Sequence, residues 1–422
     1  MSRHSDRPFT ILRVLLTSLA LWFVSSGIGR SQAERQIALV GATVLPSPTE
    51  RAISNGVVIT RGNRIAAVGP KGAVAVPTGA EIVDCSGLTI TAGFWNSHVH
   101  FMERKWADVA KIPAGEVSDA LQVMLTQYGF TSVFDIGSSW ENTRRLRDRV
   151  DSGEIAGPRI RSTGEFLVPK GGSARDLVFD IRGAMHINTP ELSEPNEGAA
   201  AAKKLIDAGV DGIKLYVSTG FPPILALSDS VIYAAVKVAH DRGKPVFAHP
   251  STREGLIAAL RGGANILAHT APQAGVLDDQ IIDEMKKTNV ALIPTLHLWE
   301  YELRHDRSPL RQRFAGVAVE QLGKWSRIGG VVLFGTDVGY HSHYDPTGEY
   351  VLMAEAGMSG RAILASLTTA PAEQFGETSR IGRIAPGYIA DLVVLRDDPI
   401  QNVRAFADVR RTIRDGRIIF GN

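Results

Sequence analysis

Cysteine is almost absent from this sequence. Cys85 is the only cysteine among 422 residues, so no disulfide can form within the chain. A strong excess of charge is also absent, because 46 basic and 44 acidic residues leave a formal net charge of +2. This balance gives no electrostatic reason to expect binding to nucleic acid. The 42 glycines and 21 prolines follow no three-residue period, which excludes a collagen-like fibre.

The sequence also lacks a hydrophobic run long enough to span a membrane. The apolar run Val14–Val24 has 11 residues, whereas a spanning helix needs about 20. It follows a start that contains Arg3 and Arg7, and it precedes the small-x-small sequence Ser31–Ala33. We therefore expect residues 1–33 to be a secretory signal peptide and the mature protein to be periplasmic or secreted. A retained membrane anchor is the alternative.

The composition allows a folded core. Hydrophobic residues make up 44% of the chain and charged residues 21%, which excludes wholesale disorder. After residue 33 the chain opens with short runs rich in valine and isoleucine, separated by glycine and proline turns, and this pattern predicts β-strands. The predicted strands are Gln36–Val44, Gly56–Thr60, Arg64–Val68 and Glu81–Asp84.

From Gly93 onward, short apolar runs alternate with amphipathic helical segments. Such an alternation suits a (β/α)8 TIM barrel, which typically takes about 250 residues. An open doubly wound sheet is the structural alternative. The predicted strands are Phe94–His98, Thr131–Asp135, Arg159–Thr163, Gly212–Val217, Pro245–His249, Asn265–His269, Ala291–Pro294 and Val331–Gly335. The predicted helices include Glu197–Ala208, Val231–Arg242, Thr252–Arg261 and Asp278–Thr288.

The end of the chain returns to strand patterns, in Ile389–Leu395 and Arg411–Phe420. We expect strands from both chain ends to pair in space and to form one small β-sandwich domain. The predicted organisation is therefore residues 34–92 and 377–422 for the β-sandwich domain, and residues 93–376 for the barrel.

Two histidines close the first predicted barrel strand. His98 and His100 are two residues apart, so the alternation of a strand places both on one face. At the carboxyl end of a barrel strand that face points into the mouth, where two neutral imidazoles can hold a divalent metal. A His-x-His pair on its own also fits an ordinary polar surface.

Lys214 lies in a strand whose alternate residues are apolar. Ile213 and Leu215 are expected to face the helices, so Lys214 and Tyr216 face the barrel interior. An unpaired ammonium there is costly. Either Lys214 reaches solvent or a carboxylate, or its pKa is depressed and it reacts with carbon dioxide to form a carbamate that can bridge two cations.

Three further residues end predicted strands, where a barrel places catalytic groups. His249 and His269 each close a short apolar run, and Asp337 closes the eighth. A carboxylate beside a metal can ligate it and can take a proton from water. Each residue alone has an ordinary structural explanation, namely a buried core histidine or a helix N-cap. Their joint occurrence on barrel strands favours a common site.

This ordered set resembles the amidohydrolase superfamily, and within it the branch of imidazolonepropionase-like and prolidase-like enzymes. The resemblance covers nearly the whole chain after residue 33. The sequence departs from the family at Asn96, where an aspartate is usual, and after Lys170, where relatives often carry a histidine. The motifs that carry the resemblance are Gly93–His100, Gly129–Asp135, Gly157–Ile160, Asp211–Lys214, Ala248–His249, Ala268–His269, Gly335–Asp337, Thr369–Ala372 and Gly382–Val394.

The resemblance implies a binuclear centre of two divalent ions, most often zinc. A carboxylated Lys214 and a hydroxide would bridge the ions. Asp337 would take the proton of the water as hydroxide attacks, and would pass it to the leaving nitrogen. The implied ligands are His98, His100 and Asp337 for one ion, and His249 and His269 for the other.

Substrate contacts are expected from residues around the mouth. Tyr216 would donate to the oxyanion or fill the barrel, and His297 would contact the substrate or activate its carbonyl. In the long segment after the third strand, a positive group would bind a substrate carboxylate. The residues expected to bind substrate are His186, Arg175, Tyr340, His341 and His343.

We predict a metal-dependent hydrolase of a carbon–nitrogen bond in a small N-acyl amino acid, a dipeptide-like compound or a related molecule. The alternatives are a cyclic amide or imidazolone hydrolase, a lactone or phosphotriester hydrolase on the same site, and a catalytically dead binding protein on this scaffold. The expected partner is a small substrate, with neither nucleic acid nor stable membrane insertion. The sequence leaves the oligomeric state open, and the exposed β domain offers an interface for a homo-oligomer.

Overall fold

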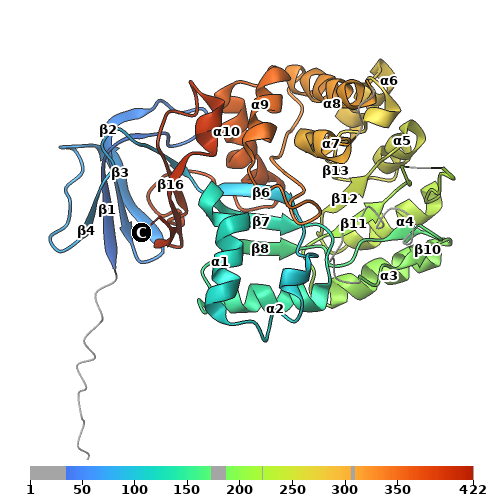
Figure 1. The fold of residues 1–422 in the computed structure, drawn as a ribbon, viewed down its shortest axis with the longest axis horizontal. Helices are drawn as coiled ribbons and strands as arrows, with labels where there is room; N and C mark the ends of the chain where they lie inside the picture. The colour runs from blue at the N-terminus through green and yellow to red at the C-terminus, as the bar shows by residue number, and fades with distance from the viewer. Residues whose placement is uncertain (1–34, 173–186, 221, 306–308, 422) are drawn as a thin grey trace, which may run out of the picture. The chain divides into compact units, whose positions relative to one another are not determined.

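The computed structural model describes residues 35–172, 187–220, 222–305 and 309–421 (Figure 1). The predicted signal peptide lies outside these residues. Within the described residues, no helix is long and apolar enough to cross a membrane.

Strands from the two ends of the chain form one sheet (Figure 1). Its order is β17-β16-β15-β5-β1-β2-β3, and β4 pairs with β1 beside this path. The junction between the two chain ends is the antiparallel pair of β5 and β15. The strands are β1 (Gln36–Val44), β2 (Ile53–Arg61), β3 (Arg64–Pro70), β4 (Glu81–Asp84), β5 (Thr89–Ala92), β15 (Leu392–Leu395), β16 (Val409–Arg414) and β17 (Arg417–Phe420).

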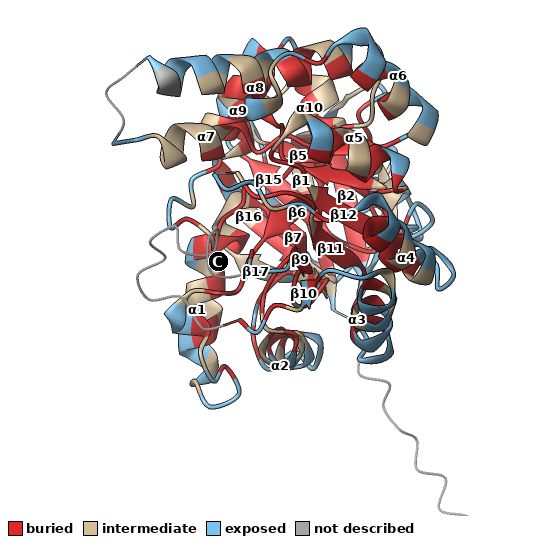
Figure 2. Ribbon diagram, turned by 90° about the vertical axis from the view of Figure 1, so that its right-hand side faces the viewer, coloured by how far each residue is buried: buried red, intermediate tan, exposed pale blue. Residues whose placement is uncertain are grey.

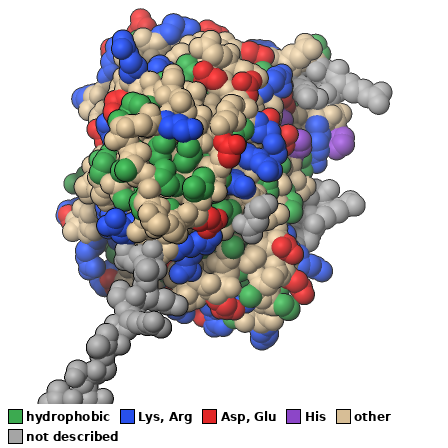
Figure 3. Space-filling view, turned by 90° about the vertical axis from the view of Figure 1, so that its left-hand side faces the viewer, with side chains coloured by type: hydrophobic (Ala, Val, Ile, Leu, Met, Phe, Trp, Pro, Cys, Tyr) green, Lys and Arg blue, Asp and Glu red, His purple; other side chains and the backbone are tan. Residues whose placement is uncertain are grey.

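Both faces of this sheet are partly covered. Along β1, Ile37 and Leu39 belong to one buried cluster, whereas Ala38 lies in a smaller cluster on the opposite side. The pairing joins the strands of both ends into a single sheet, so the two separate sheets of a β-sandwich are not confirmed. On the face shown in Figure 3, hydrophobic side chains gather among charged ones.

The middle of the chain forms two parallel sheets that face one another around a core. One has the order β6-β7-β8 and the other the order β11-β12-β13-β14. Figure 2 shows these strands buried inside a layer of helices whose outer faces are exposed. The strands are β6 (Phe94–Val99), β7 (Phe130–Asp135), β8 (Arg159–Ser162), β11 (Ile213–Tyr216), β12 (Val246–His249), β13 (Ile266–Ala268) and β14 (Ala291–Ile293).

Irregular segments close the ring between the two sheets. On one side, Leu167 bridges to Leu215 of β11. On the other side, the predicted eighth strand forms only isolated bridges, from Val332 to Leu292 and from Val338 to Val99. It still spans β14 and β6 by hydrogen bonds, because the amide of Leu333 donates to Leu292 at 2.9 Å and that of Ser97 to Phe334 at 2.8 Å. The order of strands is that of the predicted barrel.

Helices follow most of the barrel strands, and several begin at a side-chain cap. The Ser228 hydroxyl accepts from the amide of Val231 at the start of α4, and the Asp278 carboxylate accepts from that of Ile281 at the start of α6. The helices are α1 (Ala114–Met124), α2 (Trp140–Asp151), α3 (Pro195–Asp207), α4 (Asp229–His240), α5 (Arg253–Arg261), α6 (Asp279–Thr288), α7 (Leu296–Glu302), α8 (Leu310–Arg327), α9 (Thr347–Glu355), α10 (Gly360–Leu367) and α11 (Thr369–Gln374). The short strands β9 (Val168–Pro169) and β10 (Glu191–Leu192) pair with each other beside the barrel.

Candidate metal centre

The His-x-His pair and Asp337 meet at the carboxyl end of β6. The Nε2 atoms of His98 and His100 lie 3.1 Å and 2.8 Å from Asp337 Oδ1, and 3.2 Å from each other. All three side chains are buried. Asp337 has a φ of 63°, a strained conformation for a residue with a side chain, which turns its carboxylate towards the imidazoles.

A hydrogen bond fixes the orientation of His100 in this cluster. His100 Nδ1 lies 2.7 Å from the carbonyl oxygen of Gly137 and must donate to it, so Nε2 is the nitrogen that faces Asp337. Burial lowers the pKa of His98 to about 3, which keeps that ring neutral. Burial would raise the pKa of Asp337, but His98 and His100 hold it well below its ordinary value. Two imidazole nitrogens and a carboxylate oxygen therefore converge at one point, as the ligands of a divalent cation do.

His269 contributes in the same way from the end of β13. Its Nδ1 lies 2.7 Å from Thr295 Oγ1. Since that hydroxyl donates to the carbonyl of Pro294 at 2.9 Å, it accepts from His269 Nδ1. The Nε2 lone pair of His269 then faces Asp337 Oδ2 at 3.8 Å. Burial lowers the pKa of His269 well below its ordinary value. His269 also has a positive φ of 98°.

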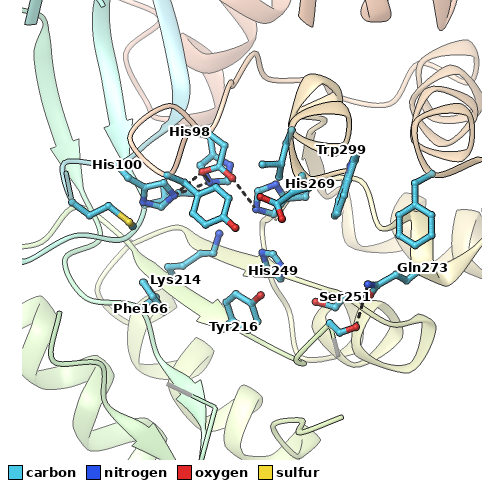
Figure 4. A pocket seen from close by; sticks show the side chains of 18 of the residues that line it. His98, His100, Phe166, Lys214, Tyr216, His249, Ser251, His269, Gln273 and Trp299 are labelled. Atoms are coloured by element: carbon cyan, nitrogen blue, oxygen red, sulfur yellow. Dashed lines mark hydrogen bonds and ion pairs between the residues drawn. The ribbon is translucent and has the colours of Figure 1, made fainter. Parts of the chain in front are cut away.

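His249 completes the group of four imidazoles (Figure 4). Its ring is 4.6 Å from that of His269, centroid to centroid, and it stacks on the Tyr216 ring at 4.0 Å. Burial lowers the pKa of His249 well below its ordinary value. The stacking fixes Tyr216 beside the imidazoles, on the inward face of β11 as the sequence predicts.

Lys214 points towards the four imidazoles (Figure 4). The side chain is buried, and among the described residues no carboxylate pairs with its ammonium. Burial lowers the pKa of Lys214 to about 7, although the charge of Asp337 opposes this effect. A large neutral fraction at neutral pH is what carbamate formation requires, because only the free amine attacks carbon dioxide.

Two buried polar residues hold these ligands in place. Asn96 joins β6 to the eighth segment: its Nδ2 donates to Thr336 Oγ1 at 2.7 Å, and its Oδ1 accepts from the amide of His98 at 3.2 Å. Asp135 accepts hydroxyl hydrogen bonds from Ser138 at 2.6 Å and from Ser162 at 2.8 Å. Asp135 thereby fixes the turn whose Gly137 carbonyl orients His100. The amide at position 96 has a structural use here that an aspartate, which has no N–H donor when ionised, would not provide.

The four histidines, Lys214 and Asp337 form the floor of a cavity of about 310 Å³. The walls contain several aromatic and aliphatic side chains and few polar ones. The lining residues outside the ligand cluster are Met102, Ile136, Phe166, Tyr216, Gly220, Ser251, Gln273, Leu298, Trp299, Glu302, Leu303, Phe314 and Tyr340. A cavity of this volume and character fits a small organic molecule.

The other residues expected to contact the substrate differ in whether they line the cavity. Tyr340 lines the cavity, but His297, His341 and His343 do not. The His297 ring lies 5.0 Å from that of His343, and its Nε2 is 3.8 Å from Glu300. His341 is buried behind the wall, with Nε2 2.9 Å from the carbonyl of Thr336. These three histidines lie outside the wall of the cavity, and their contact with a substrate stays a prediction. Arg175 and His186 lie outside the described residues.

Sequence reasoning missed several residues of the wall. Trp299, which the sequence analysis does not name, lines the cavity together with Glu302 of the same helix. The two are three residues apart, a spacing that places them on one face of α7. That spacing, on the helix after the seventh strand, is the signal that points to them.

The donor set fits a divalent cation. Within the described residues, His98, His100 and Asp337 are the group whose ligand atoms all lie within 4.8 Å of one another. Imidazole nitrogen and carboxylate oxygen are ligands that zinc accepts.

Comparison with known proteins gives consistent results. The family model described as "Amidohydrolase family" matches residues 89–419. An ochratoxinase from Aspergillus niger is 22% identical over 352 residues, which cover 75% of this chain and 72% of that protein. A solved structure of a Xaa-Pro dipeptidase with bound methionine has a TM-score of 0.77 and 23% identity, covering 91% of this chain and 99% of that one. A prolidase solved with n-methylphosphonate-L-proline has a TM-score of 0.73 and 25% identity, covering 91% of this chain and 99% of that one.

Proposed function

The chain belongs to the amidohydrolase family and is a metal-dependent hydrolase of carbon–nitrogen bonds, and on this premise we propose that it cleaves the amide of a small N-acyl amino acid, a dipeptide-like compound or a related molecule. The observation that carries the proposal is the convergence of Nε2 of His98 and Nε2 of His100 on the Asp337 carboxylate, at the floor of a cavity of about 310 Å³.

We propose that the centre holds two zinc ions. His98, His100 and Asp337 would hold one ion, and His249 and His269 the other, with carboxylated Lys214 between them. Burial lowers the pKa values of His98, His249 and His269, so these three rings are neutral, and Lys214 lies beside them; both features support this assignment. Divalent cations bound there would lower the pKa of a water molecule and polarise an amide carbonyl.

The residues of the chain supply proton transfer and positioning. Asp337, whose pKa is held well below its ordinary value, is ionised at neutral pH and can accept a proton from water at Oδ2. It would return this proton to the leaving nitrogen, which departs poorly as an anion. Tyr216 lines the cavity beside Lys214, with its ring fixed on His249, and would donate from its hydroxyl to the developing oxyanion.

The test is a hydrolysis screen on the enzyme expressed with zinc and bicarbonate. N-acyl amino acids, dipeptides, lactones and phosphotriesters are offered in parallel, with Asp337→Asn as the control. We expect the native enzyme to hydrolyse amides. We expect the rate of this hydrolysis to fall by at least about 10³-fold in Asp337→Asn. Turnover of lactones or phosphotriesters alone would contradict the proposal. We also propose that the mature enzyme is exported, which fractionation of producing cells would test.

A further inference from the structure

One side of the cavity is a fixed aromatic surface. The indole Nε1 of Trp299 donates to Thr270 Oγ1 at 2.9 Å, which locks the ring in place. The Trp299 ring lies 6.3 Å from the ring of His269 and 6.4 Å from that of Phe314, centroid to centroid. It therefore extends the wall from the proposed ligands outward, and Figure 4 shows it beside His269.

A single carboxylate lies in this surface. Among the described residues that line the cavity, Glu302 is the only charged side chain outside the proposed metal ligands. It is partly buried and shares a hydrogen bond with the side chain of Tyr340, another lining residue. Tyr340 can donate only one proton, so the remaining acceptor positions of the carboxylate are left for another donor.

No described cation forms an ion pair with Glu302, and the charge of Arg304 has the smallest effect among the causes that set its pKa. Arg304 is two residues away but exposed, and its guanidinium donates to the carbonyl of Tyr301 at 2.8 Å and lies over the Tyr301 ring at 3.9 Å. No ion pair joins Glu302 to a described residue. A partly buried carboxylate without a cationic partner is costly, and a ligand that brings a positive charge removes that cost.

Aromatic faces around a carboxylate also favour a cation. The faces of tryptophan, tyrosine and phenylalanine attract an ammonium group through their quadrupoles, most strongly for tryptophan. We propose that Glu302, Trp299 and Tyr340 form a subsite for a protonated amine, so that the preferred substrates are amides that carry a free amino group. This inference rests on the proposed function, because it names the substrate class within the same site. The subsite would favour compounds with a free amine over their N-acylated or deaminated analogues.

The experiment compares two pairs of amides that differ only in the amine. The first pair is phenylalanine p-nitroanilide and 3-phenylpropionyl p-nitroanilide, in which the amine lies on the acyl side. The second pair is N-benzoyl-ethylenediamine and N-benzoyl-propylamine, in which it lies on the leaving side. The value of kcat/KM is measured on the zinc-loaded enzyme at about pH 6.5, where the amines of both pairs are protonated. For a compound that is not cleaved, Kd is measured by calorimetry instead.

We expect at least one amine to be preferred by about tenfold or more over its analogue, and we expect Glu302→Gln to reduce this ratio to about one. The matched control is Glu300→Gln, which removes a carboxylate from the same helix but outside the cavity wall. It should keep the preference. The inference would be overturned if both amines had a kcat/KM or a binding affinity equal to or lower than that of their analogues. A preference that survives in Glu302→Gln would also overturn it.

The two proposals fail in different ways. If no amide is cleaved but an amine binds more tightly than its analogue, the proposed function fails and the amine subsite stands. If the analogues are cleaved at least as well as the amines, the proposed function stands and the amine subsite fails.

Discussion

Glu349 holds the start of the helix that carries the cavity wall. Its carboxylate is buried, and Oε2 accepts from the amide of His297 at 2.8 Å, in the first turn of α7. The other oxygen, Oε1, has no hydrogen-bond partner among the described residues. A helix N-terminus favours a negative charge, but here burial outweighs it and raises the pKa of Glu349 from 4.5 to about 7.

This pKa sets a dependence of stability on pH. The folded protein binds more protons at Glu349 than the unfolded chain between pH 4.5 and about pH 7. The free energy of unfolding therefore falls as the pH rises through this window, and the loss is complete above it. A pKa difference of about 2.5 corresponds to about 3 kcal/mol. Glu349→Gln keeps an oxygen for the amide of His297 but cannot ionise.

We therefore predict that the free energy of unfolding of Glu349→Gln rises relative to that of the native chain as the pH is raised from 4.5 to 8. The expected change in this difference is about 3 kcal/mol. The measurement is urea denaturation of both proteins across this range, with a chelator present so that metal binding does not contribute. Glu355→Gln, on the exposed side of the same helix α9, is the matched control and should change the free energy of unfolding by less than about 0.5 kcal/mol. A constant difference between Glu349→Gln and the native chain at all pH values would refute the reasoning.

Two further predictions concern the support of the ligands. Asp135→Asn should weaken zinc binding by about 10- to 100-fold, because the turn that orients His100 loses its anionic acceptor. Competition with a zinc chelator measures the zinc affinity, and an affinity equal to that of the native chain would contradict the prediction. Gly339 has a φ of 95°, and a Cβ there would lie 1.8 Å from the carbonyl oxygen of His100. Gly339→Ala should therefore lower the free energy of unfolding, measured by urea denaturation, by about 3 kcal/mol or more. Gly329 has a φ of 81° and no atom within 4 Å of an added Cβ, so Gly329→Ala should lower it by only about 1 kcal/mol. Equal losses in the two variants would show that the contact with His100 is unimportant.

Hydrophobic alternation predicted the regular parts of the fold well. Gln36–Val44 and Glu81–Asp84 form strands with the predicted bounds, because valine and isoleucine runs between turn residues are strong strand signals. β5 was missed, since Thr89–Ala92 has only four residues and Ile90 is the one large aliphatic side chain among them. The eighth strand was predicted over Val331–Gly335 but forms only the isolated bridge from Val332 to Leu292.

The site was predictable where residues close a strand and unpredictable where they come from helices. A strand end in a barrel fixes the direction of a side chain, so the four imidazoles, Lys214 and Asp337 could be expected to share one mouth, whereas their roles as ligands came from the family resemblance. Glu302 and Trp299 come from α7, whose orientation depends on its packing and on the buried cap from Glu349. The positions of His341 and His343 depend on the course of a loop after the eighth segment, which no periodicity encodes.

The metal content of the purified enzyme tests the central claim most directly. The native chain and Lys214→Ala are produced with zinc and bicarbonate, and bound metal is measured by elemental analysis beside amide turnover. The convergence of the four imidazoles, Lys214 and Asp337 predicts about two divalent ions for each native chain, and loss of bound metal and turnover in Lys214→Ala. A native chain that binds no metal, or a Lys214→Ala variant that keeps both ions and full turnover, would contradict the account.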